Sequence, residues 1–476
     1  MKIKIIICGL ILFALMFQSC DNLLDVTPKS SITGQIYWQN ESDFAPYLNG
    51  IYSSYRSAID NSIGLAEDRS EMWIQAINAR FTPYWAQNIL PGNTVDWTSY
   101  YGIIGNVNLL IEKIEPFPFS SESTKNRIAA EAYTMRAAMY FFLARVWGDV
   151  PLVLESVKDE KAPLYARTAV GAVFTQINAD LTKALSLYPD QTYSNKNKWT
   201  KPAAYALLAD VKMWSATVLK GGAPDFTAAT DAITVVENSG VALESTYGNV
   251  FDNRKNNEII FSLFLNRSEY TSTGINFGIS RFDVSGSATN AADLPLSLIG
   301  QAGYILSPRA LELFAANPAD KRISRTYIAE INGTVVRYVW PNKFRGTKYA
   351  DDRVPDNDFI IYRLSDMQLL KAEAYAALDQ SANAIVSLNK VRTRAGIPDY
   401  VFTNKAALQK AILDERGREL FHEYKRWYDL MRANAMGVID VKTFIPNYIG
   451  KTTPLYWAVH TNVLAKNNLL VQTTGY

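Results

Sequence analysis

The chain has 476 residues, of which 48 are Lys or Arg and 46 are Asp or Glu, so its formal net charge at pH 7 is +2. A balance this even excludes the basic footprint that nucleic-acid binding needs. The two histidines, His422 and His460, are too few for a His-rich metal site. With 10 Trp, 27 Tyr and 21 Phe, the chain is rich in rings that suit flat apolar ligands as well as core packing.

The N-terminal segment predicts export and lipid attachment. Lys2 and Lys4 precede an apolar run over residues 5–17, which is shorter than the roughly 20 residues that a membrane-crossing helix needs. Ser19 then stands before Cys20, as in a bacterial lipobox, so we expect residues 1–19 to be a signal peptide and Cys20 to carry lipid. The alternative is an ordinary cleaved signal in which Cys20 is incidental. Residues 20–40 form a polar tether.

Helical periodicity in the rest of the chain predicts a mainly α fold. It covers residues 41–59, 97–114, 128–147, 169–187, 203–219, 226–238, 365–378 and 382–395. The last six helices form pairs, and the second helix of each pair carries small or apolar residues at offsets 0, 4 and 7 before a Pro or Gly. This stripe resembles the tetratricopeptide pattern, and its members are Ile177, Leu181 and Ala184; Ala228, Ala232 and Val235; and Ala384, Leu388 and Val391. The helix over 97–114 fits less well, because Asn108 lies on its stripe.

Two stretches lack this periodicity. Residues 60–96 predict a long loop, and loops of that length are usually functional. Residues 241–364 predict an irregular insertion with short strands at 257–264 and 334–340. Within it Asp351, Asp352, Asp356 and Asp358 could hold a structural calcium ion, but their spacing fits no EF-hand loop. We therefore expect a solvated loop there, and no cofactor.

Residues 406–432 predict one long helix with Glu415, Glu419 and Glu423 on one face. Like charges at this spacing destabilise an isolated helix, so cations must neutralise them. We expect a partly buried ion-pair network that locks the helix to the preceding hairpin, with close packing at Gly417 and cations from Arg392, Arg394, Arg416, Arg418 and Arg426. The alternative is a glycosidase pair, but carboxylates paired with Arg are poor acids. His422 is expected to be a packed or surface histidine rather than a catalytic base.

Six ordered motifs carry a family resemblance from Cys20 to Arg432. They are CDNLLDVTP, YWQNESDFAPYLNGIYSSY, AEAYTMRAAMYFFLARVWGDVPLV, FIIYRLSDMQLLKAEAYAAL, LNKVRTRAGIP and ERGRELFHEYKRWYDLMR. The chain resembles the SusD/RagB family of outer-membrane nutrient-binding lipoproteins. The resemblance implies tetratricopeptide-like hairpins with a ligand-facing insertion, no catalysis, and a place at the cell surface as capture protein for a SusC-like TonB-dependent channel. It divides the chain into a helical region (41–240), the insertion (241–364), a hairpin with the long helix (365–432) and a packed tail (433–476).

The expected ligand is a glycan, with peptide or another nutrient as the alternative and a lipid-anchored glycan hydrolase as a third possibility. Sugar rings present flat CH faces that stack on Trp or Tyr, and their hydroxyls need planar donors and acceptors. The first candidate group is Trp73, Arg80, Trp85 and Asn88 in the long loop. The second is Tyr270, Tyr304 and Trp340 in the insertion. For each ring the alternative is a role in core packing.

Overall fold

The computed structural model describes residues 37–75, 83–158, 162–193, 195–269, 288–294, 304–351 and 353–476. Residues 44–476 form one compact unit, and residues 1–43 form a second. Four predicted residues lie outside the described ones, namely Cys20, Arg80, Tyr270 and Asp352, and for Tyr304 only the backbone is described. Among the described residues, no helix is both long enough and apolar enough to cross a membrane.

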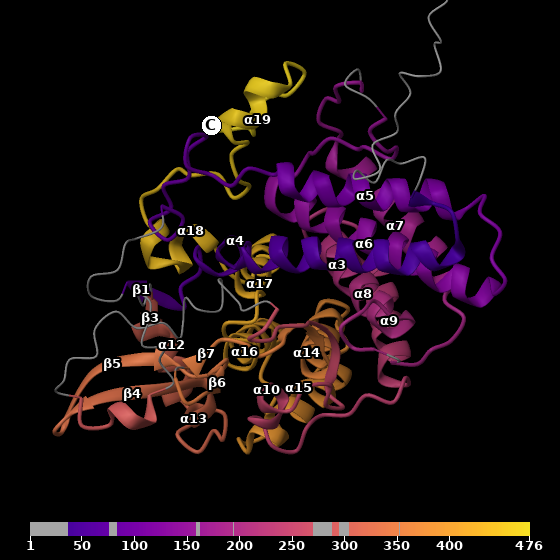
Figure 1. Ribbon diagram of the computed structural model, residues 1–476. Helices are drawn as coiled ribbons and strands as arrows, with labels where there is room; N and C mark the ends of the chain where they lie inside the picture. Colours follow the sequence, from indigo (N-terminus) through magenta and orange to yellow (C-terminus); the bar gives the residue numbers. More distant parts are fainter. Residues whose placement is uncertain are drawn as a thin grey trace, which may run out of the picture. The chain divides into compact units, whose positions relative to one another are not determined.

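Helices dominate the unit of residues 44–476 and confirm the predicted mainly α class (Figure 1). They pack in the expected pairs, α6 on α7, α8 on α9 and α14 on α15, while α3 and α5 pack beside α6. Helix α6 begins ahead of its predicted start because the Ser121 hydroxyl accepts a hydrogen bond from the Thr124 amide (3.2 Å). The bounds are α3 Phe44–Asp60, α5 Thr98–Ile114, α6 Glu122–Trp147, α7 Val170–Leu187, α8 Lys201–Thr217, α9 Ala223–Glu237, α14 Leu364–Ala377 and α15 Ser381–Ala395.

The predicted stripe is buried in α7 and α15, but in α9 it is displaced. There Ala232 is buried, whereas Ala228 and Val235 are half-buried, and the core side of α9 is formed by Phe226, Ala229, Ile233 and Val236. In α5, Asn108, the residue that does not fit the stripe, is buried because its side chain links the segment after α6 to α6 itself. Its amide donates to the Val153 carbonyl (3.0 Å) and its oxygen accepts from Arg136 (3.0 Å).

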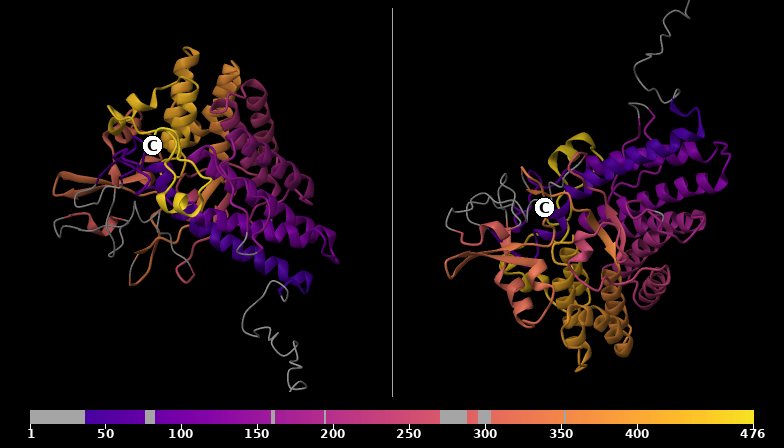
Figure 2. Two further views of the ribbon diagram at one scale, coloured as in Figure 1. Left: turned by 90° about the horizontal axis from the view of Figure 1, so that it is seen from above. Right: turned by 60° about the horizontal axis from the view of Figure 1, so that its bottom comes forward.

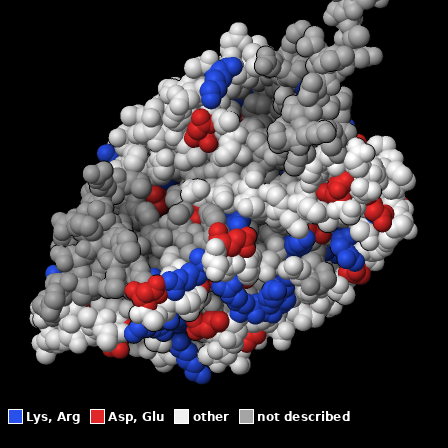
Figure 3. Space-filling view, viewed as in Figure 1, with Lys and Arg blue, Asp and Glu red and all other residues white. Residues whose placement is uncertain are grey.

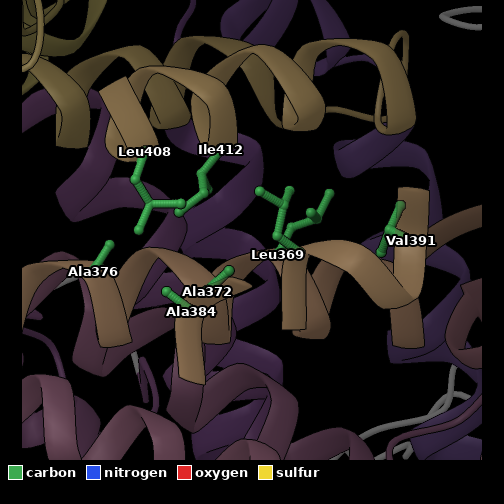
Figure 4. Packing of buried hydrophobic residues seen from close by; sticks show 8 residues of the cluster. Leu369, Ala372, Ala376, Ala384, Val391, Leu408 and Ile412 are labelled. Carbon is green, nitrogen blue, oxygen red and sulfur yellow. The ribbon is translucent and has the colours of Figure 1, made fainter. Parts of the chain in front are cut away.

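One hydrophobic cluster joins α14 and α15 to α16, Lys405–Glu419. Ala384, Leu388 and Val391 on α15 face Leu369, Ala372 and Ala376 on α14, and Leu408 and Ile412 close the cluster from α16 (Figure 4). The small alanines let the helices approach closely, which is the physical basis of the stripe.

The predicted helix over 406–432 is interrupted, and this prediction is wrong. Helix α16 ends at Glu419 and α17 spans Arg426–Ala435. Between them His422 (φ 59°) and Tyr424 (φ 66°) adopt the left-handed backbone conformation. The turn is held by tertiary contacts. Glu67 accepts a hydrogen bond from the Lys425 amide (3.1 Å), and the buried Tyr424 ring stacks 6.4 Å from Phe142.

The prediction of an uninterrupted loop over 60–96 is also wrong in its first part. Helix α4, Ile63–Glu67, and strand β1, Trp73–Gln75, lie there. Both predicted strands in the insertion are confirmed, as β2 Ile259–Leu263 and β5 Val335–Pro341. The described residues form four antiparallel pairs: β1 with β3 (Tyr304–Leu306), β2 with β8 (Phe359–Arg363), β4 (Tyr327–Asn332) with β5, and β6 (Thr347–Lys348) with β7 (Arg353–Val354).

Short helices and 3-10 turns complete the described chain. They are η2 Glu41–Asp43, α10 Asn249–Asp252, η3 Ala291–Asp293, α12 Pro308–Ala315, α13 Ile323–Thr326, α18 Val441–Phe444, η4 Pro446–Tyr448 and α19 Thr461–Lys466. The C-terminal segment runs back over the helices. The Trp457 amide donates to the Val146 carbonyl (2.9 Å), and the Trp147 indole donates to the Ala458 carbonyl (3.0 Å).

The β4–β5 ribbon lies at the end of this unit that is remote from α7 and α9, as the views of Figures 1 and 2 agree. On the face shown in Figure 3, Lys and Arg side chains lie directly beside Asp and Glu side chains. Mixed charge of this kind matches the balanced composition.

Candidate functional site

Trp73, in the first candidate group, is a core residue. Its side chain belongs to a buried cluster with Met72, Leu306 and Leu313. Its ring lies 4.7 Å from the Phe421 ring and 5.0 Å from the His422 ring, and only 3% of the residue is exposed. A ring this enclosed offers little surface to a sugar in the described structure.

Trp85 is more accessible than Trp73 and stands on a well-braced loop. It is half-buried, packs on the edge of the same cluster and donates from its indole to the Trp73 carbonyl (3.0 Å). Asn88, three residues on, is exposed, and its backbone N–H donates to the Pro83 carbonyl (2.8 Å). The loop is tied down by the buried Gln87, whose side-chain amide donates to the Arg69 carbonyl (3.1 Å).

The second group contributes Trp340 on β5, which has polar neighbours. Trp340 is 4% exposed, and its indole donates to Glu330 on the facing strand β4 (2.8 Å). Tyr338 lies on the same face, is half-buried, and has its ring 5.4 Å from the Trp340 ring. Arg337 contacts the other oxygen of Glu330 (3.4 Å) and also approaches the Tyr338 ring (5.5 Å). We call Glu330, Arg337, Tyr338 and Trp340 the ribbon cluster.

Three members of the ribbon cluster were missed by sequence reasoning. Period-2 alternation on the predicted strand places Tyr338 beside Trp340 on one face, so a signal for Tyr338 was present. Glu330 lies on β4, which the sequence did not identify as a strand, and its pairing opposite Tyr338 follows only from the hairpin register.

The two candidate groups meet on neighbouring strands but on opposite faces. Strand β1 pairs with β3, and β3 lies against β5. Trp73 shares its face with Leu306 and Val339, toward α12 and Phe421. Trp340 shares the other face with Ile305, Ile328 and Leu294. The described rings therefore form two separate surfaces, one with Trp85 at its edge and one with the ribbon cluster.

The glutamates of the interrupted helix form a buried ionic core, as predicted. Glu415 pairs with Arg418 (2.7 Å) and Arg392 (2.9 Å), and Glu419 pairs with Arg394, so α16 is locked to α15. Glu423 pairs with Lys343 (2.6 Å) rather than with the predicted Arg426. Arg426 instead pairs with Glu71, and Arg416 pairs with Asp366 and Asp429. Further buried members of this core are Glu258, Asp320, Arg322 and Arg363.

Arginine partners keep two glutamates of this core ionised. Burial alone would raise the pKa of Glu415, but the guanidinium groups of Arg322, Arg418 and Arg392 lower it to about 2. Burial is likewise outweighed at Glu419, where Arg394 and Arg363 hold the pKa well below its usual value. Such carboxylates are poor proton donors. Gly417 fits the same packing, since an added Cβ would lie 3.1 Å from Arg426 and 3.3 Å from Leu313.

His422 is a packed histidine, as expected. It is 2% exposed, and burial together with the charge of Lys343 lowers its pKa to about 3, so the imidazole is neutral. The aspartate loop differs from its prediction. Asp356 and Asp358 are buried rather than solvated, and protein donors serve them: Tyr349 and the Thr347 amide for Asp356, Asn197 and Arg254 for Asp358. No cluster of three or more His, Cys, Asp or Glu side chains suited to a metal ion occurs in the described part of the chain.

Two family models match the chain. The model described as "SusD family" matches residues 317–476, and the model described as "Starch-binding associating with outer membrane" matches residues 23–213. Among curated relatives, SusD-like protein P25 of Formosa agariphila is 26% identical and the match covers 91% of this chain and 90% of that protein. A SusD-like protein of Bacteroides ovatus is also 26% identical, with 88% and 80% covered.

Solved structures show the same fold. B. fragilis NanU superposes with a TM-score of 0.82 at 28% identity, covering 95% of this chain and 100% of that one. A laminarin binding SusD-like protein superposes with a TM-score of 0.76 at 21% identity, covering 92% and 100%. Together the two models, the relatives and the shared fold make this chain similar to the SusD family over most of its length.

Proposed function

We propose that this protein is a lipid-anchored capture protein on the surface of the outer membrane, which binds glycans and passes them to a SusC-like TonB-dependent channel without cleaving them. Support for the ligand class comes from the matching model named for starch binding and from the structural neighbour named for laminarin binding. The same model name supports the outer-membrane location.

The observation that carries the proposal is the ribbon cluster. A half-exposed tyrosine ring, Tyr338, stands beside the guanidinium of Arg337 on one two-stranded ribbon, and the buried Glu330 holds both that guanidinium and the Trp340 indole in place. A sugar can use such a pair, because its CH faces stack on a ring while its hydroxyls pair with planar donors. The half-buried Trp85 and the exposed Asn88 offer a second platform of similar composition. Of the residues predicted from sequence, Trp85 and Asn88 are accessible and keep their place in this proposal, with Arg80, Tyr270 and Tyr304 as untested members. Trp340 is as enclosed as Trp73, and its part is to support Tyr338 and Glu330.

The carboxylates support binding without turnover. A glycosidase needs two carboxyl groups facing the scissile bond, one of them able to donate a proton. Glu415 and Glu419 are held ionised inside the ionic core by their arginine partners. Glu330 is fully buried and its two oxygens serve Trp340 and Arg337. The oxygens of these three carboxylates are therefore occupied by protein groups and do not face a substrate.

The test is calorimetric titration of the mature chain with soluble polysaccharides, including starch and laminarin, and with peptides, followed by product analysis of the same samples. Tyr338→Ala and Trp85→Ala should each weaken polysaccharide binding by about 5- to 30-fold, since a stacking ring contributes roughly 1–2 kcal/mol. Tyr205→Ala on α8 is the matched control, because Tyr205 is also half-buried but lies on the helical scaffold.

Each outcome has a clear meaning. Saturable polysaccharide binding that both variants weaken and the control does not would support the proposal. Shortened products would overturn the absence of turnover. Binding of peptides alone would replace glycan by peptide as the captured nutrient.

A further inference from the structure

A cavity lies on the helical scaffold, where α6 and the segment after α7 meet the N-terminus of α8. It has a volume of about 240 Å³, and we call it the α8 pocket. Its charged lining consists of Arg127, Glu131, Asp190, Lys198 and Lys201. The volume is below the roughly 300–1,000 Å³ of sites for larger organic ligands, so it suits a single sugar-sized molecule.

The floor of the α8 pocket is a buried carboxyl group. Glu131 is 5% exposed, and one of its oxygens accepts a hydrogen bond from the Tyr52 hydroxyl (2.8 Å). That hydroxyl is itself fixed, because it accepts from the Trp199 amide (2.8 Å). The second oxygen of Glu131 has no hydrogen-bond partner among the described residues. Burial raises the pKa of Glu131 to about 7, against the opposing charge of Lys198.

Glu131 lines the pocket, so this oxygen is available to a ligand that enters it. In its ionised form the carboxylate only accepts hydrogen bonds, so the ligand group that pairs with this oxygen is a donor such as a hydroxyl. The floor therefore selects a ligand with at least one hydroxyl or similar donor at its inner end.

The rim of the α8 pocket carries the opposite charge. Lys201 is the first residue of α8, directly after Thr200, whose hydroxyl caps the helix through the Ala203 amide (3.4 Å). A helix N-terminus adds a partial positive charge of its own. Arg127 pairs with Asp190 (3.4 Å), and the two side chains are 44% and 45% exposed. An exposed ion pair of this kind is weak, so Arg127 can leave Asp190 and contact a ligand instead. Lys198, the third cation, donates to Asn49 (2.8 Å).

We propose that the α8 pocket binds a small hydroxycarboxylate of about one sugar ring, with a hydroxyl on the free oxygen of Glu131 and the carboxylate against Lys201, Arg127 and the N-terminus of α8. A uronic acid unit has this chemistry. If the pocket is a subsite for acidic glycans, this inference rests on the proposed capture function. Binding of a free sugar acid to the pocket does not depend on that function.

The probe is D-glucuronate, titrated calorimetrically into the full mature chain, with D-glucose and the methyl ester of glucuronate as neutral analogues. We expect saturable binding of glucuronate and at least about tenfold weaker binding of both neutral analogues, because a charge-assisted contact is worth roughly 1.5–3 kcal/mol. The double variant Arg127→Ala/Lys201→Ala should lose about tenfold or more by the same reasoning. Lys183→Ala is the matched control, since Lys183 is an exposed lysine of α7 that does not line the pocket.

Glu131→Gln tests the floor separately. Glutamine keeps an acceptor for Tyr52 but turns the free oxygen into an N–H donor, so the ligand hydroxyl loses its acceptor and glucuronate should bind more weakly. Both rim side chains reach the surface, so the rim variant should unfold at the same temperature as the wild type. An unchanged unfolding temperature would show that a loss of binding does not come from a loss of folding.

Three results would overturn the inference: no saturable binding of glucuronate, equal affinity for glucose, or equal affinity of the wild type and the rim variant. These are independent of the ribbon cluster. Tyr338→Ala should leave glucuronate binding intact while it weakens polysaccharide binding, so a failure of glycan capture and a failure of the α8 pocket give different results.

Discussion

Glu67 is a single residue whose burial should govern how stability depends on pH. It lies in α4, is 3% exposed, and accepts the Lys425 amide in the turn between α16 and α17. Burial raises its pKa to about 8, and the amides of Lys425 and Tyr424 oppose this only in part. The folded protein therefore keeps this proton up to about pH 8, whereas the unfolded chain releases it near pH 4.5.

The sign of the effect follows from proton linkage. Between pH 4.5 and pH 8 the folded state binds more protons at Glu67 than the unfolded state, so this group makes the protein less stable as pH rises. The slope is about 1.4 kcal/mol per pH unit for one fully linked proton.

We predict that Glu67→Gln removes this slope. Glutamine resembles the protonated acid, so the variant should gain free energy of unfolding relative to the wild type between pH 5 and pH 8, by up to about 1.4 kcal/mol per pH unit. Urea unfolding at several pH values measures the difference. Glu312→Gln is the control, because that carboxylate is 67% exposed. Parallel pH profiles of wild type and Glu67→Gln would contradict the assignment.

Partners of single residues were predictable from sequence where they lie on the same helix or on the hairpin directly before it, as Arg392 and Arg394 do. Glu415 and Arg418 are three residues apart on one helix, and the spacing alone indicated their pair. Glu423, in contrast, pairs with Lys343 and Arg363, which lie 80 and 60 residues away in the sequence. No helical spacing encodes those contacts, because β8 and the segment after β5 bring them to the turn.

At the scale of elements, Arg322 joins the segment before α13 to α16. It is fully buried and contacts Asp320 (2.6 Å), Glu415 (2.7 Å) and Glu419 (2.9 Å). We predict that Arg322→Leu lowers the free energy of unfolding by about 3–5 kcal/mol, because it leaves buried carboxylates with an incomplete set of cations.

Chemical unfolding of Arg322→Leu checks this prediction against Lys405→Ala. Lys405 pairs with Asp379 at 2.7 Å, but their side chains are 44% and 75% exposed, so its loss should change stability little. An effect of Arg322→Leu no larger than that of the control would mean that the remaining arginines suffice for the core.

The end of α16 illustrates why an element boundary escaped the sequence. Residues 420–425 contain no Gly or Pro, and their apolar spacing continues the helical pattern. The backbone nevertheless turns at His422 and Tyr424, where the Phe142 ring, Glu67 and the ionic core supply more stabilisation than two further turns of helix. Tertiary contacts decided this boundary. The same applies to α9, whose stripe is displaced because its packing face is set by α8 and α14.

At the scale of the whole molecule, the helical scaffold was predictable, whereas in the insertion the strands β2 and β5 were predictable but the pairing of the strands was not. Hairpin helices are encoded locally, through periodicity, caps such as Ser121 and breakers such as Gly396. Two strand pairs of this region, β1 with β3 and β2 with β8, join distant segments, as when Trp73 pairs with Leu306. A single sequence contains no signal for such a register. For this reason the sequence identified Trp73, Trp85 and Trp340 as rings of interest but could not tell that Trp73 and Trp340 are enclosed.

The last prediction concerns Cys20, which lies outside the described residues. The apolar run over residues 5–17 and the Ser19-Cys20 pair favour a lipobox, in which the Cys20 thiol receives a diacylglyceryl group after the signal is cut away. Two acyl chains give stable anchoring where a single chain gives only marginal membrane binding. Cys20→Ala should therefore abolish incorporation of labelled palmitate and move most of the protein from the membrane fraction to the supernatant. Fractionation and labelling of intact cells measure both effects, with Cys8→Ala as the control, since Cys8 is removed with the signal. If Cys20→Ala stays membrane-bound and Cys8→Ala behaves identically, Cys20 is an incidental residue after an ordinary signal, and the proposed anchor at the cell surface fails while the binding surfaces described above are unaffected.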